Sequence, residues 1–575
     1  MIRGEPLFSI RMLKVCVGLA GLLYLINFGL LGFLLGPFDY DHISGYYEIA
    51  WRYWRYGSGL PHFNPFLCGG RPLAGDPQLP LFHPIIVLVP LLGAVWTVKI
   101  ELLFQLSLGL WGLNGILKSL GCLAEERWWA AFCYLCGGAI VARFLVGHVA
   151  IGYSLFTPAI LYIAHRLDDK PLGPGLILSY WLLYWYGFLG KPNFAIMAVP
   201  ALFIESTARS FTKRSPVPLA HALLACAVGT LLNLPSALPA LDYFALYPRL
   251  NDGIPNAIPL HTFFLSLLLP LKTLPEKLYG PHYFGRHEYA LFLGAVPAVL
   301  AAIGLRRNWR EPHLMALLIW ALASVTIGLG TDSAANYLRP YTWFYSYWPG
   351  FQSVRAPMRL WYAAFLAVIV FSALAFRTRW PGSRRFWLII TAVPLLLNAA
   401  INLSKTTILA RKTQWAGESR YTDQFTLTSG AASNYFPIRR GEGTRHCFFN
   451  IVIPQAPLAE GPMLPEIPGV TLRWLGWNQI RVEWDRPPPK LALNLNHATY
   501  WRFEGSGATV SSKDGEPLTL TFSQGPVHGS LLYELPRLKL ALFVALATVA
   551  ASAMVLIGLM VYTRGHDVPS HRTHR

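Results

Sequence analysis

The stretch MLKVCVGLAGLLYLINFGLLGFLLGPFDYDH, residues 12–42, decides the fold. Residues 12–35 carry a single charge, Lys14, and a helix needs about 20 apolar residues to cross a bilayer. Because no small-residue cleavage site follows the segment, we expect a retained span rather than a removed signal peptide. Two acids, Asp39 and Asp41, come directly after it. The sequence therefore predicts a membrane protein with carboxylates at the rim of the bilayer.

The composition supports a membrane protein over the whole length. Of the 575 residues, 54% are hydrophobic and 13% are charged, whereas soluble domains carry about 25% charged residues. The net charge of +19 could suggest nucleic acid, but the basic residues are spread over short loops between apolar runs. This distribution is typical of cytoplasmic loops, and the sequence predicts no contiguous basic surface interleaved with aromatic residues. We therefore expect the lipid bilayer, and no nucleic acid, as a partner.

Apolar segments recur along the chain. They predict about twelve transmembrane helices, near residues 12–35, 98–118, 129–147, 150–166, 173–190, 193–208, 217–238, 289–305, 313–330, 358–376, 384–403 and 537–562. With the N-terminus in the cytoplasm, nearly every short basic loop falls on the cytoplasmic side, and so does the C-terminus. A further span at residues 83–96 would reverse every later loop, so we expect a re-entrant or interfacial helix there, broken at Pro84 and Pro90.

The composition also divides the chain into parts. Residues 1–403 are expected to form the transmembrane domain, with a first extracytoplasmic loop at 36–82 and a second long loop at 239–288. Residues 404–535 contain short alternating runs such as TLRWLGWNQIRVEW, punctuated by Pro and Gly, and predict a β-rich extracytoplasmic domain. Residues 536–575 hold the last helix and a basic cytoplasmic tail. The fold class is a polytopic α-helical membrane protein with a β-rich domain before its last helix.

The cysteines suggest packing rather than chemistry. Cys133 and Cys136 form a CxxC inside a predicted membrane helix, without a second pair or a nearby histidine, so buried packing is favoured over metal or redox chemistry. Cys68 and Cys447 are both expected outside the cytoplasm, where a disulfide between them could form.

The first loop holds the most concentrated polar chemistry. ISGYYEIAWRYWRYG, residues 43–57, has the spacing of an amphipathic helix in the headgroup region, either to bind phosphates through its arginines or only to anchor the chain as part of an aromatic belt. The Pro- and Gly-rich stretch after it predicts a fixed irregular loop and brings in a third acid, Asp76.

Three carboxylates near a low-dielectric region need partners or a role. Arg71 could pair with Asp76. Asp41, with Asp39, Asp76, His42 or His83, could hold a divalent cation such as Mg²⁺ or Mn²⁺. Asp41 alone could accept a proton from an attacking hydroxyl. For Asp39, a cap at the start of the surface helix is an equal alternative.

Several stretches resemble the YfhO-like membrane proteins, which are grouped with the GT-C superfamily of membrane glycosyltransferases. They are PHFNPFLCGGRPLAGDPQLPLFHP at residues 61–84, HEYALFLGAVPAVLAAIGL at 287–305, FQSVRAPMRLWYAAFLA at 351–367 and LNLNHATYWRFEGSG at 493–507. The chain departs from the family pattern at His62, and the loose match of DYDHISGYY leaves two acids as candidates. By its position ahead of Tyr46 and Tyr47, Asp41 is favoured over Asp39.

The resemblance implies a GT-C-like fold in a bacterial inner membrane and transfer of a hexose or pentose, with inversion. The donor would be a polyprenyl-phosphate-linked sugar and the acceptor an extracytoplasmic glycan, lipid or protein. The expected catalytic acids are Asp41, Asp39 and Asp76, with Asp41 as the base. A cation site would draw on Asp41, Asp76 and His83.

The expected contacts to the substrate or the lipid phosphate come from Arg71, His83, His287, Glu288, Arg355 and Arg359. Arg355 and Arg359 are one helical turn apart and could clamp the phosphate, or they could only reach lipid headgroups. Glu288 could bind substrate hydroxyls or a metal, or it could be a helix N-terminal acid. Isolated histidines, among them His148, His261 and His313, are interpreted as structural.

The sequence leaves two other functions open. One is a transporter or flippase of lipid-linked glycans, although such proteins place polar residues in broken helices at mid-membrane and show inverted repeats. The other is a non-catalytic envelope-assembly scaffold whose β-rich domain binds polymers.

Overall fold

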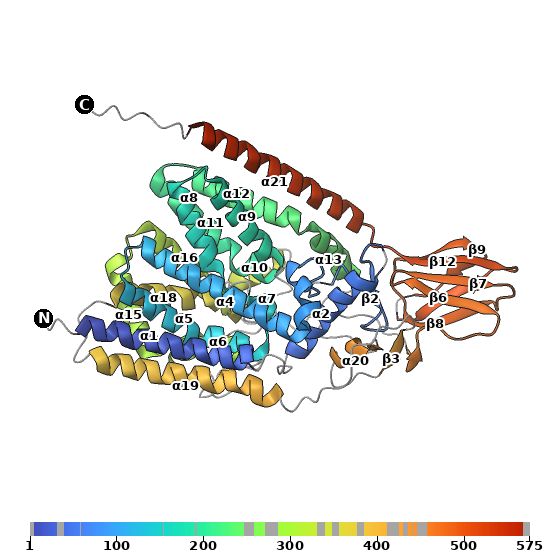
Figure 1. The fold of residues 1–575 in the computed structure, drawn as a ribbon, viewed down its shortest axis with the longest axis horizontal. Helices are drawn as coiled ribbons and strands as arrows, with labels where there is room; N and C mark the ends of the chain where they lie inside the picture. Colours follow the sequence, from blue (N-terminus) through green and yellow to red (C-terminus); the bar gives the residue numbers. More distant parts are fainter. Residues whose placement is uncertain are drawn as a thin grey trace.

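The computed structural model places a bundle of helices next to a group of β-strands at one end of the molecule (Figure 1). It describes residues 5–30, 39–57, 59–76, 78–152, 155–189, 192–246, 258–270, 286–330, 340–347, 356–376, 384–410, 425–428, 435–440, 442–444, 457–513 and 515–566.

The helical bundle has the composition of a multi-pass membrane protein. In the described part of the chain, seven helical segments are long and apolar enough to span a bilayer, or eight if a bent pair is one span. The seven are Ile10–Asn27, Ala94–Ser119, Ala124–Val146, Phe194–Lys213, Pro357–Ala375, Phe386–Ser404 and Leu538–Thr563, and the bent pair is Val217–Leu232 with Leu234–Phe244.

The expected number of about twelve spans is not confirmed. Four further apolar segments do form helices, but these have only 13 to 17 residues, which is short for a crossing. They are α8 (Thr157–Asp169), α9 (Pro174–Leu189), α15 (Ala295–Asn308) and α16 (Pro312–Gly328).

The bundle is made of helices that the chain breaks at proline and glycine. Its remaining members are α1 (Glu5–Tyr24) with η1 (Leu25–Leu30), α4 (Ala94–Ser119), α5 (Ala124–Cys136), α6 (Gly138–Val146), α7 (Val149–Gly152), α10 (Pro192–Met197), α11 (Val199–Lys213), α12 (Val217–Leu232), α13 (Leu234–Leu246), α14 (Leu260–Leu268), α17 (Pro340–Tyr347), α18 (Tyr362–Ala375), α19 (Arg384–Ala410) and α21 (Leu538–His566). Two 3₁₀ turns, η4 (Arg286–Tyr289) and η6 (Pro357–Trp361), contact helices of the bundle and each other.

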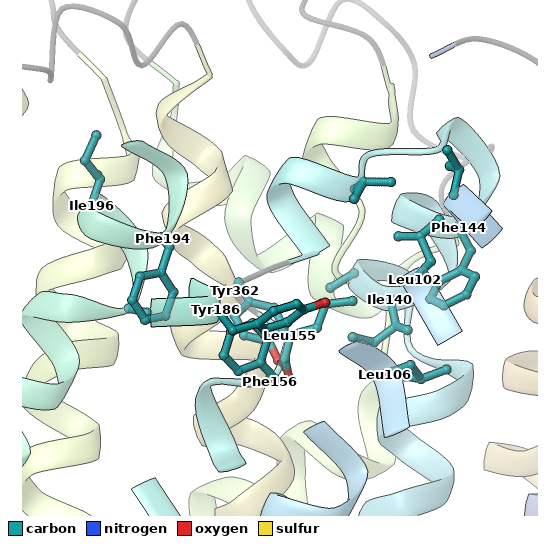
Figure 2. Packing of buried hydrophobic residues seen from close by; sticks show 14 of the residues in the cluster. Leu102, Leu106, Ile140, Phe144, Leu155, Phe156, Tyr186, Phe194, Ile196 and Tyr362 are labelled. Atoms are coloured by element: carbon teal, nitrogen blue, oxygen red, sulfur yellow. Dashed lines mark hydrogen bonds between the residues drawn. The ribbon is translucent and has the colours of Figure 1, made fainter. Parts of the chain in front are cut away.

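Aromatic and aliphatic side chains pack together in the buried core of the bundle (Figure 2). Phe156 stacks on Phe194 with 5.9 Å between ring centroids, and Tyr186 lies 5.1 Å from Phe156. Cys133 and Cys136 are buried and free, as expected for packing residues.

The first loop is more buried than a surface helix would be. Its helix α2 (Asp39–Tyr56) buries Tyr46, Tyr47 and Tyr53, and only Trp54 among its large aromatic side chains is half exposed. Two short strands follow, β1 (Phe63–Asn64) and β2 (Arg71–Pro72), paired antiparallel. The tight turn between them needs glycine at residue 70, where φ is +108° and a Cβ would lie 2.3 Å from the ring of Phe63.

The segment 83–96 agrees with an interfacial rather than a spanning element. It forms η2 (Pro84–Leu88) and α3 (Val89–Leu92), each with a proline in its first turn. Val87 is 67% exposed and Leu91 is 76% exposed, so both are available to lipid. Gly93 then turns the chain into α4.

The strands form a β-rich region between α19 and α21. One sheet has the order β6-β7-β12-β9, a second has β10-β11-β8, and a third small sheet has β4-β3-β5. Their bounds are β3 (Thr426–Thr428), β4 (Glu442–Thr444), β5 (Gly461–Pro462), β6 (Val470–Gly476), β7 (Gln479–Trp484), β8 (Lys490–Asn496), β9 (Trp501–Ser506), β10 (Ala508–Val510), β11 (Pro517–Phe522) and β12 (Val527–Tyr533), with a short helix α20 (Tyr435–Arg440). The alternation of half-buried and buried residues along β7 and β11 is the period-2 pattern seen in the sequence. Helix α19 continues to Ala410, past the boundary expected at 404.

The β-rich region holds the first loop in place. Phe63 donates its N–H to Asn478 Oδ1 at 2.8 Å, and Asn496 donates its N–H to the carbonyl of Gly69 at 2.9 Å. At the base of α21, the N–H of Leu535 donates to His62 Nδ1 at 2.9 Å. Cys68 in the same loop is disulfide-bonded, while its expected partner Cys447 lies outside the described residues. The conformation of the first loop is therefore set by residues more than 400 positions away in the chain.

Candidate active site

A buried carboxylate held by two arginines lies where η4, η6 and α6 meet. Glu288 on η4 is buried and accepts a hydrogen bond from Arg143 Nη1 at 2.8 Å. Arg359 on η6 reaches the same carboxylate through both Nε, at 3.0 and 3.1 Å, and Nη2. This fork geometry matches a carboxylate or a phosphate equally well.

Two histidines complete this group, which we call the Glu288 cluster (Arg143, His148, His287, Glu288 and Arg359). His148 Nδ1 lies 2.9 Å from Arg143 Nη1, and the two histidine rings are 5.0 Å apart. His287 Nε2 is 3.7 Å from Glu288 Oε1. The side chains of His287 and Arg359 are 25% and 23% exposed, whereas that of Glu288 is 3% exposed. The cluster thus has a buried carboxylate, that of Glu288. Its partly exposed side, formed by His287 and Arg359, is called the cationic edge.

The charge of the Glu288 cluster favours an anion. Burial alone would raise the pKa of Glu288, but the guanidinium groups of Arg359 and Arg143 and the hydrogen bond from His287 hold that pKa well below its usual range. Glu288 is therefore ionised and cancels one of the two arginine charges. One positive charge of the two arginines is left over, and a nearby phosphate would be stabilised by it.

The first turn of α2 packs on α6 and the residue after it, next to Arg143 and His148 in the sequence. Tyr40 donates its hydroxyl proton to the carbonyl of Phe144, at 2.6 Å, one residue after Arg143. Gly147, one residue before His148, has a φ of +78°, and a Cβ there would lie 2.8 Å from the ring of Tyr40. The absence of a side chain at residue 147 is what lets α2 approach this closely.

The first turn of α2 carries two of the expected catalytic acids. α2 begins at Asp39, and Asp41 is half-buried on the same turn as Tyr40. On the other side of Tyr40, Lys99 of α4 is buried with its Nζ 5.7 Å from the ring centroid. Tyr40, at the start of α2, thus contacts both Lys99 of α4 and the backbone of α6 one residue after Arg143.

The third acid has a different environment. Asp76 is 1% exposed and forms an ion pair with Arg71, which also donates to the hydroxyl of Tyr46 at 2.8 Å. The other oxygen, Oδ1, accepts the N–H of Gln78 at 3.0 Å. Asp76 raises the pKa of Arg71 above its ordinary value against the effect of burial. Of the alternatives for Asp76, pairing with Arg71 is the one that the structure shows.

The residues expected to hold a divalent cation do not come together as a ligand set. Asp76 is engaged by Arg71 and Gln78, and His83 Nδ1 accepts the N–H of Ile85 at 3.1 Å as the cap of η2. His83 Nε2 faces Glu101 of α4 at 3.3 Å, and burial lowers the pKa of His83 despite that acid. The described part of the chain has two groups of metal-ligating residues, and neither includes Asp41, Asp76 or His83.

The structure therefore brings together part of the expected site. Glu288, His287 and Arg359 lie in one cluster, and Asp41 and Asp39 lie in the first turn of α2, which contacts α6 through Tyr40. Arg71 and Asp76 form a separate buried pair, and Arg355 lies outside the described residues.

Sequence reasoning missed Arg143, His148 and Lys99. Arg143 and Lys99 lie inside apolar segments, where an ionisable residue is costly and marks a functional site by default, so this signal was present in the sequence. His148 carried no such signal, because only the fold places it within reach of His287.

Comparisons with known proteins add one structural likeness. No family model and no curated protein matches the chain. Among solved structures, one match is the arabinofuranosyltransferase AftD from mycobacteria, with 15% sequence identity and a TM-score of 0.40 over 70% of this chain. The match spans 26% of that protein.

Proposed function

We propose that this chain is a membrane glycosyltransferase of the GT-C type. It moves a hexose or pentose from a polyprenyl-phosphate carrier to an acceptor outside the cytoplasm, and the sugar inverts at its anomeric carbon. The observation that carries the proposal is the cationic edge of the Glu288 cluster, whose Arg143 lies on the helix that the first turn of α2 contacts through Tyr40. A single displacement needs a base and an anion-stabilising group on either side of the reacting carbon.

Each group has one role in this reaction. Asp41 accepts the proton of the acceptor hydroxyl while the hydroxyl oxygen forms a bond to the anomeric carbon. The bond between that carbon and the phosphate oxygen breaks, and the polyprenyl phosphate leaves with its added negative charge. Arg359 and His287, at the accessible edge of the cluster, receive this charge. Glu288 and Arg143 hold Arg359 in its fork geometry from behind.

The remaining expected residues support the site from outside the reaction. Arg71 and Asp76 fix the loop after α2 through their ion pair and through the hydrogen bond that Arg71 donates to Tyr46. Because Asp76 and His83 are already engaged, no step of the proposal runs through a divalent cation. Asp39 sits at the helix start, where a carboxylate is favoured by the helix dipole.

The proposal includes a topology. The chain lies in a bacterial inner membrane with both termini in the cytoplasm, and the short apolar helices α8, α9, α15 and α16 lie in the bilayer beside the longer ones, giving about twelve helices. The first loop and the β-rich region then share the outer face, in agreement with the hydrogen bonds between them. The YfhO-like signature in the first loop supports the same arrangement.

Release of polyprenyl phosphate tests the function without knowledge of the acceptor. Membrane vesicles with the full chain are supplied with a panel of polyprenyl-phosphate-linked hexoses and pentoses, and the freed carrier is separated by chromatography. Loss of a general base lowers rates by about 10²- to 10⁴-fold, so Asp41→Asn should release at least 100-fold less carrier. Asp485→Asn, at an exposed acid in the β-rich region, should match the wild type.

Two outcomes would contradict the proposal. Normal release by Asp41→Asn at equal protein level would remove this residue from the role of base. Movement of an intact labelled donor across the vesicle, with no carrier released, would identify a transporter.

A further inference from the structure

A second cluster of metal-ligating residues lies at the other end of α4, away from α2. It is formed by His165 on α8, Glu205 on α11 and His313 on α16, and their ligand atoms all lie within 4.8 Å of one another. The last turns of α4, including Ile116, line the cavity next to it. With a rise of about 1.5 Å per residue, α4 separates this cluster from α2 by roughly 30 Å, about the thickness of a bilayer core.

The geometry of the three ligand atoms suits a small tetrahedral ion. His165 Nε2 lies 2.8 Å from Glu205 Oε1, and His313 Nδ1 lies 3.5 Å from the same oxygen. Ligands held at about 2.1 Å around a tetrahedral Zn²⁺ are roughly 3.3 Å apart. His313 Nδ1 is buried and makes no hydrogen bond, so a buried lone pair or proton points into the cluster without a good partner.

The residues behind Glu205 hold it in a fixed orientation. Arg209 donates from Nε to Glu205 Oε2 at 2.9 Å and from Nη1 to both Asp168 Oδ1 and the carbonyl of Ala164, each at 2.7 Å. Lys213 Nζ lies 3.0 Å from Asp168 Oδ2. Such outer contacts orient a carboxylate ligand and are typical of metal sites.

A cavity provides room for a fourth ligand. It has a volume of about 40 Å³, and its lining includes His165, Glu205 and His313 as well as Leu161 and Leu317. One water needs roughly 10–15 Å³ of such space. The wall is otherwise apolar, which shields the polar groups and strengthens an ion's interaction with them.

We propose that His165, Glu205 and His313 bind one borderline divalent ion, of which Zn²⁺ is the best fit, with a water from the cavity as the fourth ligand. Two imidazole nitrogens and one carboxylate favour Zn²⁺, Co²⁺ or Ni²⁺ over Mg²⁺ and Ca²⁺, which require mainly oxygen ligands. The ion ties together α8, α11 and α16 at the membrane face opposite the candidate active site. This role does not depend on the proposed transferase activity.

The test uses the purified full-length chain with any affinity tag removed. The wild type, His165→Gln, His313→Gln and the matched control His261→Gln, whose histidine is exposed on α14, are each treated with one equivalent of ZnCl₂ and desalted. Elemental analysis should find one more zinc per chain in the wild type and in the control than in the other two. Zinc should also raise the melting temperature of the wild type and the control only.

Equal zinc in all four proteins would overturn the proposal, because any binding would then lie elsewhere. If the two ligand variants fail to fold, X-ray absorption of zinc bound to the wild type decides the matter. Two imidazole nitrogens and a carboxylate around the ion support the site, and any shell without two imidazoles contradicts it.

Discussion

His287 and Arg359, the two partly exposed members of the cationic edge, determine what the Glu288 cluster can bind. Arg359 keeps 23% of its side chain accessible while it holds Glu288 through two nitrogens. Arg143 is nearly buried and neutralises the same acid. Under the proposed function, an incoming phosphate would therefore meet a guanidinium that is already oriented and whose charge is only partly compensated. Preorganisation of this kind costs nothing at the moment of reaction.

Replacing Arg359 by lysine should show whether phosphate binding needs only a positive charge or also the fork geometry of arginine. Lysine keeps the positive charge but loses the fork, and a charge-assisted hydrogen bond contributes about 1.5–3 kcal/mol. We expect kcat/KM for the lipid-linked donor to fall by roughly 10- to 100-fold, measured as carrier release over a range of donor concentrations.

Two comparisons interpret the Arg359→Lys result. The control Arg473→Lys, on the exposed side of β6, should behave as wild type. If Arg359→Lys loses thermal stability but retains kcat/KM, Arg359 only neutralises Glu288 and does not contact the phosphate.

At the scale of single elements, the approach of α2 to α6 sets the distance between the carboxylates and the cationic cluster. Tyr40 fills the space above Gly147, so any side chain there must push the start of α2 outward. The amphipathic pattern of α2 was readable in the sequence, but it indicated a helix lying on the membrane surface. The structure buries its tyrosines instead, because α4 and the β-rich region cover faces that no local pattern identifies.

Gly147→Ala should impair activity more than stability. The left-handed backbone costs a non-glycine residue about 1–2 kcal/mol, and displacement of a catalytic group by an ångström can cost on the order of 100-fold in rate. Gly121→Ala is a close control, because Gly121 has a φ of +76° and nothing within 4 Å of its Cβ position. Both variants should lose similar stability in a melting experiment, and only Gly147→Ala should release less carrier. Equal activities would mean that Tyr40 adapts without moving Asp41.

Over the whole molecule, hydropathy and alternation predicted the main architecture because a bilayer-spanning helix and a half-buried strand each impose a period on the sequence. They could not predict the number of spans, since helices of 13 to 17 residues are ambiguous between crossing and packing. They also could not predict that Arg143 and Glu288, 145 positions apart, share one ion pair. Contacts between residues so far apart in the sequence depend on tertiary packing, which leaves no periodic pattern in the sequence.

The junction between the first loop and the β-rich region should weaken in acid. Burial lowers the pKa of His62 from 6.5 to about 4, with Glu534 opposing and Lys539 assisting the shift. The neutral ring accepts the N–H of Leu535, so stability is fully present above pH 6.5 and is lost as the pH falls towards 4. A shift of this size is worth on the order of 3 kcal/mol, measured as melting temperature against pH.

Asparagine can replace His62 without titrating, because its Oδ1 can accept the same N–H. His62→Asn should therefore flatten the pH dependence between 6.5 and 4, whereas His528→Asn, at an exposed histidine on β12, should leave it unchanged. An unaltered pH profile in His62→Asn would assign the acid sensitivity to other groups.

Asn478 should hold the first loop against the β-rich region. Its side chain accepts the N–H of Phe63 and donates to the carbonyl of Leu60, so Asn478→Ala leaves a buried N–H unpaired at a cost of about 1–3 kcal/mol. We expect faster protease cleavage in the first loop and reduced carrier release. Gln479→Ala, which removes only a bond to Ser530 within the sheet, should change neither, and equal cleavage rates in both variants would show that the junction does not depend on Asn478.

The junction also imposes an order on synthesis. The loop at residues 60–70 is made more than 400 residues before its partners Asn478, Asn496 and Leu535 leave the ribosome. A chain that is still being made can insert its early helices but cannot bring the loop after α2 to its final packing. Under the proposed function, the lipid carrier would therefore meet a finished site only after residue 535 has been made, which keeps shorter nascent chains from consuming activated sugar.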